Sequence, residues 1–254
     1  MKVVDTRRMS RIDREAQERF GIPEIVLMED ASCGIFLLMR ESVWNGRVPR
    51  GPVVFLAGKG NNGGDALAAA RHCHYSGMRN LFVILGAGEP MAASPAGVHL
   101  KILRSLGLEV VDYCSQDKGA AVRRAHTLLG RAECLVDGLL GTGLNGEVRP
   151  PLKDLIRRCN ESGAFRIAVD IPSGIGDAYR LGFTAYQADC TLTVQLPKLC
   201  LYLPFTRRFC GDIHTVAGVF PPQLIDQEDI PGYLIDEPIK QRLLEPLDLS
   251  LIHI

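Results

Sequence analysis

The stretch GKGNNGGD (residues 58–65) combines a glycine motif with side chains that could do chemistry. Its glycines fit the spacing G-x-G-x-x-G between an apolar run and an alanine-rich segment. A loop of that kind between a strand and a helix is typical of sites that hold a phosphate at a helix N-terminus. Asn61, Asn62 and Asp65 add amide and carboxylate groups. These polar groups are more than a loop that only binds a pyrophosphate requires.

The glycine motif leaves two kinds of site open. A dinucleotide that transfers hydride also needs an acidic residue at the end of the second strand, where it binds the adenosine ribose. Here the second strand is followed by GAGEP, and Glu89 lies well past the apolar run. No G-K-[ST] follows the glycines, which excludes a Walker A loop. A redox dinucleotide site remains one interpretation, and a different nucleotide-like site is favoured because the acidic residue is missing from the end of the second strand.

Short β-branched runs alternate with helical segments from residue 53 onward. The predicted strands are Val53–Ala57, Leu81–Leu85, Glu109–Val111, Cys134–Asp137, Arg166–Asp170 and Cys190–Val194, with Ile213–Val216 as a candidate seventh. Helices are predicted near Ala66–Tyr75, Ser94–Leu106, Lys118–Leu129 and Leu152–Ser162, after two N-terminal helices at Thr6–Phe20 and Ile25–Val43. This alternation predicts a parallel sheet covered by helices on both faces.

Charged and glycine-rich segments follow several of the predicted strands. Asp137 ends the fourth strand and precedes LLGTGLNGE, Asp170 ends the fifth, and Lys198 follows the sixth. Ligands of such sheets bind beyond the carboxyl ends of the strands. We therefore expect three carboxylates, those of Asp65, Asp137 and Asp170, to meet two glycine-rich loops and Lys198 at one edge of the sheet.

Composition sets limits on the partners of the chain. It has 254 residues, 46% of them hydrophobic, with 29 basic and 29 acidic residues. That balance gives no global field for nucleic acid or for an anionic membrane. No apolar run reaches the length of about 20 residues that spans a bilayer, and the N-terminal residues do not have the pattern of a signal peptide. The eight cysteines are dispersed without metal-site spacing, which predicts reduced thiols in a cytoplasmic protein.

Several motifs in order resemble one family. AGKGNNGGDALAAARH, VDGLLGTGLNGEVRPPL, AVDIPSGIGDA and ADCTLTVQLPKLCLYLP are similar to segments of the YjeF N-terminal domain family of NAD(P)HX epimerases, and RIDREAQERFGIPEIVLMEDA resembles its two N-terminal helices. The resemblance implies a Rossmann-like three-layer αβα sandwich with a mostly parallel sheet, in a protein that is usually a homodimer. It also implies that hydrated NADH or NADPH is the substrate, so that no hydride moves.

The resemblance also assigns roles by position. It implies substrate contacts by Asn61, Asn62, Gly63, Gly64, Asp65, Gly141, Thr142, Gly143, Leu144, Asn145, Gly146, Glu147 and Asp170. It implies that Asn62, Asp137 and Ser173 ligate a potassium ion, which prefers oxygen ligands. Asp170 is the expected proton-transferring group, and Lys198 is a second, supporting catalytic candidate. The same positions could belong to a non-catalytic binding or scaffold module, which is the alternative from another functional class.

The resemblance divides the chain at about residue 225. Residues 1–225 are expected to form the epimerase domain. Residues 226–254 are expected to be a C-terminal extension that resembles a truncated linker to a dehydratase domain absent from this chain. A fused or separate ADP- or ATP-dependent NAD(P)HX dehydratase is accordingly an expected partner.

Overall fold

A seven-stranded parallel sheet forms the centre of the molecule. The computed structural model describes residues 1–115, 117–226 and 232–233. The strands are β2 (Val53–Ala57), β3 (Leu81–Leu85), β4 (Glu109–Asp112), β5 (Cys134–Gly138), β6 (Phe165–Val169), β7 (Cys190–Val194) and β8 (Asp212–Val216), in the spatial order β4-β3-β2-β5-β6-β7-β8. Every neighbouring pair is parallel. The predicted strands, including the candidate seventh, are confirmed to within one or two residues.

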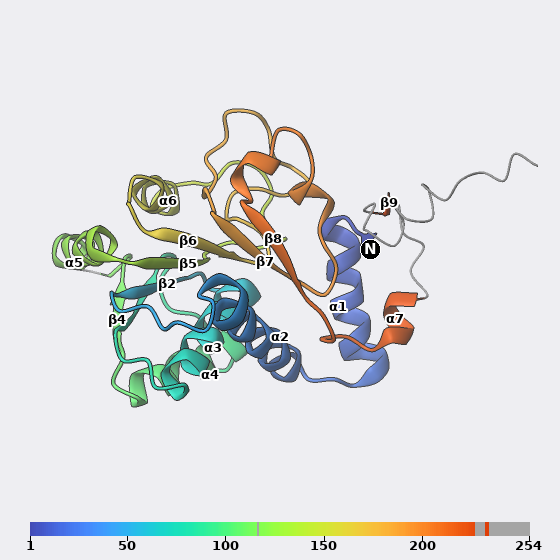
Figure 1. Ribbon diagram of the computed structural model, residues 1–254, viewed down its shortest axis with the longest axis horizontal. Helices are drawn as coiled ribbons and strands as arrows, with labels where there is room; N and C mark the ends of the chain where they lie inside the picture. The colour runs from blue at the N-terminus through green and yellow to red at the C-terminus, as the bar shows by residue number, and fades with distance from the viewer. Residues whose placement is uncertain (116, 227–231, 234–254) are drawn as a thin grey trace, which may run out of the picture.

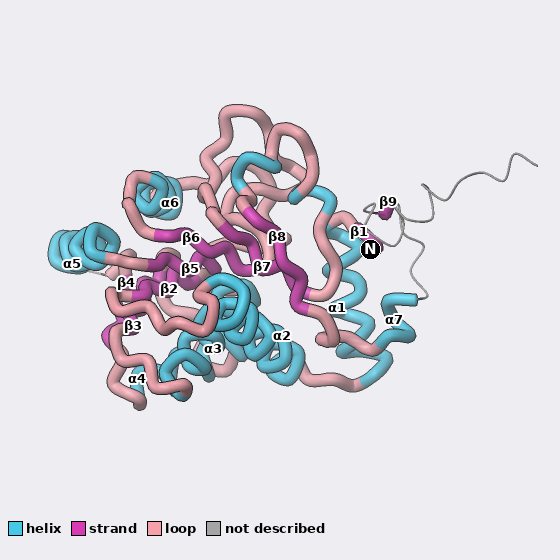
Figure 2. Tube along the Cα trace, viewed as in Figure 1, coloured by secondary structure: helices cyan, strands magenta, loops and turns pink. Residues whose placement is uncertain are grey.

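Helices cover both faces of the sheet, which confirms the three-layer architecture (Figures 1 and 2). One layer contains α2 (Glu24–Leu38), α3 (Asn61–Tyr75) and α4 (Pro95–Ser105), and the other contains α5 (Lys118–Arg131) and α6 (Leu152–Asn160). Alternate residues of one strand enter different cores: Val53 and Phe55 pack with the first layer, while Val54 and Leu56 pack with the second. This alternation is the expected result of burying a strand on both faces.

Two helix boundaries differ from the sequence prediction. The third helix begins at Asn61 and not near Ala66, because Gly64 N donates to Gly60 O at 3.0 Å and closes a first helical turn. A Cβ atom on Gly63 would lie 2.1 Å from Gly58 O, so only glycine allows this turn to pack on the preceding loop. The second helix ends at Leu38, and a π-helical turn, η1 (Met39–Val43), completes the predicted segment.

The N-terminus is tied to the segment after β7. Helix α1 (Thr6–Phe20) begins with Asp5, whose Oδ1 accepts from Arg8 N at 2.7 Å. Just before it, Val4 N donates to Pro197 O at 3.1 Å, and Leu199 N donates to Val4 O at 2.8 Å. These bonds hold α1 beside the carboxyl ends of the central strands (Figure 1).

A small antiparallel pair was not predicted from the sequence. It joins β1 (Lys2–Val3) to β9 (Gly232–Tyr233), after the last helix, α7 (Pro222–Asp226). The proposed domain boundary near residue 225 falls within α7, and most of the proposed extension 226–254 lies outside the described residues. Among the residues that are described, no helix combines the length and hydropathy that would span a membrane.

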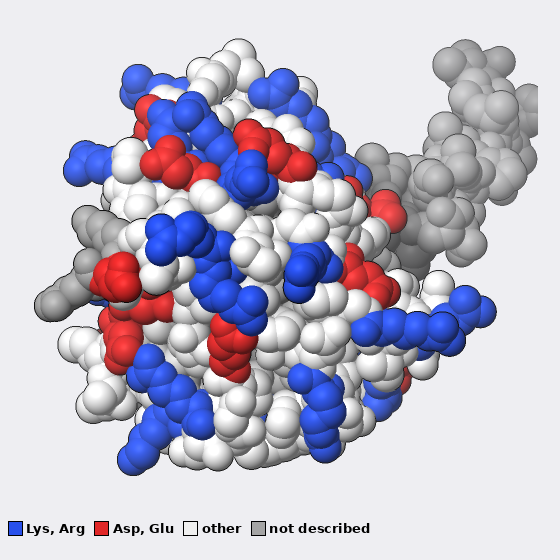
Figure 3. Space-filling model, turned by 90° about the vertical axis from the view of Figure 1, so that its left-hand side faces the viewer, with Lys and Arg blue, Asp and Glu red and all other residues white. Residues whose placement is uncertain are grey.

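The cysteines and the surface charges agree with what the composition suggests. All eight cysteines are free thiols, and six of them are buried. On the face shown in Figure 3, basic and acidic side chains are interspersed, as the equal numbers of the two charges suggest.

Candidate functional site

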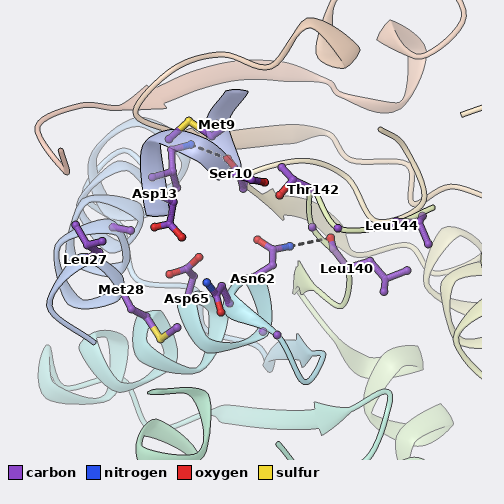
Figure 4. A pocket seen from close by; sticks show the side chains of 18 of the residues that line it. Met9, Ser10, Asp13, Leu27, Met28, Asn62, Asp65, Leu140, Thr142 and Leu144 are labelled. Atoms are coloured by element: carbon purple, nitrogen blue, oxygen red, sulfur yellow. Dashed lines mark hydrogen bonds between the residues drawn. The ribbon is translucent and has the colours of Figure 1, made fainter. Parts of the chain in front are cut away.

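A pocket of about 610 Å³ opens where the strand order reverses, between β2 and β5. Helices α1 and α2 form one wall, the first turn of α3 forms the floor, and the loop after β5 forms the opposite wall (Figure 4). In parallel α/β sheets such a switch point separates two loops that leave in opposite directions, which creates a crevice for a ligand. The pocket therefore lies where the topology predicts a binding site.

Most of the predicted site residues meet at this pocket. Those that line it are Asn61, Asn62, Gly63, Asp65, Gly141, Thr142, Gly143, Leu144, Asn145, Asp170 and Lys198. Asp137 and Ser173 lie below the surface and are fully buried. Gly64 is buried under α2 and packs so closely that a Cβ atom there would lie 2.4 Å from Met28 Cε. Gly146 and Glu147 are outside the lining, and Glu147 forms an ion pair with Lys153.

Asp170 occupies a tight turn at the end of β6. It has φ of 63°, in the left-handed region that residues other than glycine rarely adopt. Its Oδ1 atom accepts from Val194 N at 3.0 Å and from Thr193 Oγ1 at 3.3 Å. Asp170 thus bonds to the end of the next strand, and its carboxylate is held at the pocket wall.

Lys198 is fully buried beside that carboxylate. Its Nζ atom donates to Asp170 Oδ1, to Val194 O at 2.7 Å and to Thr193 Oγ1 at 3.3 Å. An ammonium group has three protons to donate, and all three have an acceptor here. The contacts of Lys198 therefore neutralise and orient Asp170, while direct contact with a substrate stays a prediction.

Asp137 and Ser173 join β5 to the loop after β6. Asp137 Oδ2 accepts from Ser173 N at 2.8 Å, and its Oδ1 accepts from Ser173 Oγ at 2.7 Å and from Leu139 N at 3.1 Å. Burial raises the pKa of Asp137 from 3.8 to about 6, although the bonds from Ser173 and Leu139 favour the charged form. A positive charge near this carboxylate would offset its burial.

Asn62 carries an oxygen that the described protein leaves unsatisfied. Its Nδ2 donates to Leu140 O at 2.9 Å, and Leu140 N donates to Ser173 Oγ at 2.8 Å. Asn62 is 8% exposed, and its Oδ1 atom has no hydrogen-bond partner in the part of the chain that the structure describes. A buried oxygen of this kind is costly unless a ligand, water or ion completes it. The side chains of Asn62, Asp137 and Ser173, which come from three segments, are thus linked by hydrogen bonds through Leu140.

Glycines bring the two loops of the switch point together. A Cβ atom on Gly58 would lie 2.0 Å from Leu139 O, and one on Gly138 would lie 2.6 Å from Asn62 O. Only a bare backbone fits at these approaches. The glycine motif after β2 therefore serves loop packing as well as ligand access.

The residues expected of a redox dinucleotide site are not assembled at β3. That strand is followed by Gly86, Ala87 and Gly88, and the next residue, Glu89, pairs with Arg104 at 2.6 Å. Glu89 thus lies in an exposed ion pair and does not line the pocket at the switch point. The geometry favours the nucleotide-like alternative over hydride transfer.

Sequence reasoning missed the contribution of the N-terminal helices to the pocket. Asp13 of α1 and Glu24 of α2 line it together with Met9, Leu27 and Met28. In the sequence, Asp13 directly follows Ile12 of the apolar stripe of α1, which is only a weak signal. The structure shows that its side chain is partly buried. The local sequence of a helix does not determine which distant segment it will pack against.

Comparisons with known proteins bear on the family to which the chain is related. The sequence model of the family described as YjeF-related protein N-terminus matches residues 24–200. The chain is 36% identical over 221 residues to the NAD(P)H-hydrate epimerase of Rhodopirellula baltica, across 87% of this chain and 85% of that protein. It is 30% identical to the bifunctional NAD(P)H-hydrate repair enzyme Nnr of Dictyoglomus turgidum, across 84% of this chain but 39% of that longer protein.

A solved structure shares the fold. The crystal structure of yeast ynu0 superposes with a TM-score of 0.72 at 21% sequence identity, covering 93% of this chain and 98% of that one.

Proposed function

The chain belongs to the family of YjeF-related protein N-termini, and from that premise we propose that it is an NAD(P)H-hydrate epimerase. The substrate would be NADH or NADPH that has added water across a ring double bond. The reaction would interconvert the two epimers of this hydrate at the carbon that carries the hydroxyl group, C6. No electrons are transferred, so the dinucleotide is substrate and not redox cofactor.

One observation carries the proposal: an oriented carboxylate stands in the pocket at the switch point. Asp170 is held by Thr193, Val194 and Lys198, and it lines the same pocket as the glycine-rich segments from α3 and from the loop after β5. A fixed charged group beside phosphate-compatible loops fits chemistry on the ring of a bound dinucleotide. A module that only binds or acts as a scaffold does not need a buried ion pair such as Asp170 and Lys198 in its pocket.

The proposed role of Asp170 follows from the chemistry of the hydrate. C6 is bonded to both a hydroxyl group and the ring nitrogen, so its stereochemistry can be lost when either the hydroxyl leaves or the ring opens. Both routes move a proton to or from oxygen, which a positioned carboxyl group can assist by about 10²- to 10⁴-fold. Asp170 is the candidate for this transfer, and Lys198 maintains its charge and direction.

The pocket residues also fit the potassium ion that the resemblance implies. Asn62 Oδ1 is buried without a partner among the described residues, and Asp137 and Ser173 supply a carboxylate and a hydroxyl within the same hydrogen-bonded group. A large monovalent cation prefers oxygen ligands of this type. When bound, its charge would offset the burial of Asp137 and the negative charge of the substrate phosphates.

The test is to follow the ratio of hydrate epimers by chromatography, starting far from equilibrium, in potassium and in sodium buffers. The expected result is relaxation faster than in a protein-free control, with a higher rate in potassium. Asp170→Asn should slow the reaction by at least about 10²-fold. Relaxation at the protein-free rate would reject the enzyme and favour a binding module, and equal rates in both salts would reject the role of potassium.

From the resemblance we further propose that the protein is a homodimer and that a dehydratase is its partner. Light scattering of the purified chain measures its molar mass and so tests the homodimer. The chain spans about two fifths of the length of the bifunctional relatives. Adding a separate NAD(P)HX dehydratase to the epimerase assay tests for coupled repair.

A further inference from the structure

Two carboxyl groups of the pocket face each other across it. Asp13 projects from α1 and Asp65 projects from the first turns of α3, and their carboxyl groups point toward one another (Figure 4). They come from segments about fifty residues apart, and the docking of α1 beside the sheet edge brings them together. Asn62 Oδ1, unsatisfied in the described residues, lines the same pocket and independently marks it as a ligand site.

Neither of these carboxyl groups has a basic partner among the residues that the structure describes. Asp13 Oδ2 accepts one long hydrogen bond, from Gln17 Nε2 at 3.3 Å. The carboxyl of Asp65 has no hydrogen bond or ion pair within the described ranges. This contrasts with Asp170, which Lys198 neutralises.

The charged groups around Asp65 favour its neutral form. They are Asp13 from α1, Glu24 from α2, Asp170 after β6 and Lys198 after β7, so three carboxylates oppose one ammonium that Asp170 already engages. Burial first and these like charges second raise the pKa of Asp65 well above its ordinary value. Burial and Glu24 also raise the pKa of Asp13. Two acidic groups that share a site cannot both ionise readily.

We propose that Asp65 is the general acid of the epimerisation and that Asp13 is the positioning residue that keeps the proton on Asp65. This assignment rests on the proposed function. The acid and base roles then belong to two carboxyl groups in different environments: Asp65 donates a proton, and the Asp170 carboxylate accepts one.

The proposed step conserves atoms and electrons. The Asp65 proton moves to the C6 hydroxyl, the C6–O bond breaks, and its electron pair leaves with water. The lone pair of the ring nitrogen forms an N1=C6 double bond. Water then adds to the other side of C6, the π electrons return to nitrogen, and the Asp170 carboxylate takes the released proton. The reverse conversion uses the two groups in exchanged roles, and exchange with solvent restores the starting state.

The test compares the pH dependence of kcat/KM for the wild type, Asp13→Asn and Glu18→Gln. Glu18 is an exposed carboxylate on the same helix, so its variant matches the change in charge outside the pocket. The wild-type rate should fall on the alkaline side as Asp65 loses its proton. Removing the charge of Asp13 lowers the pKa of Asp65, so this alkaline limb should move to lower pH by about one unit. Glu18→Gln should leave it in place.

Asp65→Asn should lower kcat by at least about 10²-fold, because an amide cannot act as the acid. A second measurement needs no active variant: in the wild-type protein with ¹³C-labelled aspartate, one carboxyl signal, absent from Asp65→Asn, should titrate well above the ordinary aspartate range. An unmoved alkaline limb in folded Asp13→Asn, or an Asp65 signal in the ordinary range, overturns the assignment. A wild type without epimerase activity rejects the proposed function instead, and the carboxyl titration still decides whether Asp65 is held neutral.

Discussion

Replacing Lys198 by methionine would test how the site holds its charged carboxylate. The substitution keeps the length of the apolar stem and removes the ammonium group, which is fully buried. Three hydrogen bonds are lost, to Asp170, Thr193 and Val194. The fold is expected to survive, since methionine fills the same space.

The expected cost follows from the geometry of the pair. Removing one partner of a buried ion pair typically costs about 3–5 kcal/mol, since the remaining charge is left without compensation. The Asp170 side chain keeps 15% exposure toward the pocket, where water can solvate it. We therefore expect the lower end of that range, about 3 kcal/mol of unfolding free energy.

Urea unfolding of Lys198→Met, Asp170→Asn and the double variant measures this cost and the coupling between the two groups. The double variant should be more stable than the sum of the single costs predicts, with a coupling of about 2 kcal/mol. Lys153→Met is the matched control, because Lys153 and Glu147 form an ion pair with side-chain exposures of 24% and 40%. Its cost should stay below about 1 kcal/mol. Strictly additive costs, or equal losses for Lys198→Met and the control, would refute the reasoning.

Three further predictions follow from the site. Potassium in place of sodium should raise the melting temperature, by the equivalent of about 2.7 kcal/mol at a hundred times its Kd, and Asn62→Ala should remove this gain in a thermal-shift assay. Gly58→Ala would place Cβ 2.0 Å from Leu139 O and should cost about 3 kcal/mol, whereas Gly143→Ala, with open space around its Cβ, should stay within about 0.5 kcal/mol in the same urea assay. Because burial raises the pKa of Asp137 from 3.8 to about 6, the folded protein binds this proton more tightly than the unfolded chain. Stability should therefore fall by about 3 kcal/mol as pH rises through that interval in potassium-free buffer, and a pH-independent difference between the wild type and Asp137→Asn would contradict this.

The sequence by itself determined the sheet and the edge at which the chemistry collects. Short apolar runs that contain β-branched residues identify strands such as Val53–Ala57 and Cys190–Val194, and their alternation with helices makes the sheet parallel. Parallel order then places the carboxyl ends at one side, so Asp137, Asp170 and the glycine-rich segments had to lie at the same edge of the sheet. These inferences need only local patterns and the handedness of the crossover.

Only the tertiary structure decided which side chains touch. The start of α3 at Asn61 depends on the close approach of Gly63 to Gly58, which a glycine-rich sequence permits but does not require. The pairing of Lys198 with Asp170 depends on turns at the ends of two strands, and the arrival of Asp13 opposite Asp65 depends on hydrogen bonds of Val4 to the segment after β7. The energies of such contacts come from atoms far apart along the chain, so no local pattern of residue types records them.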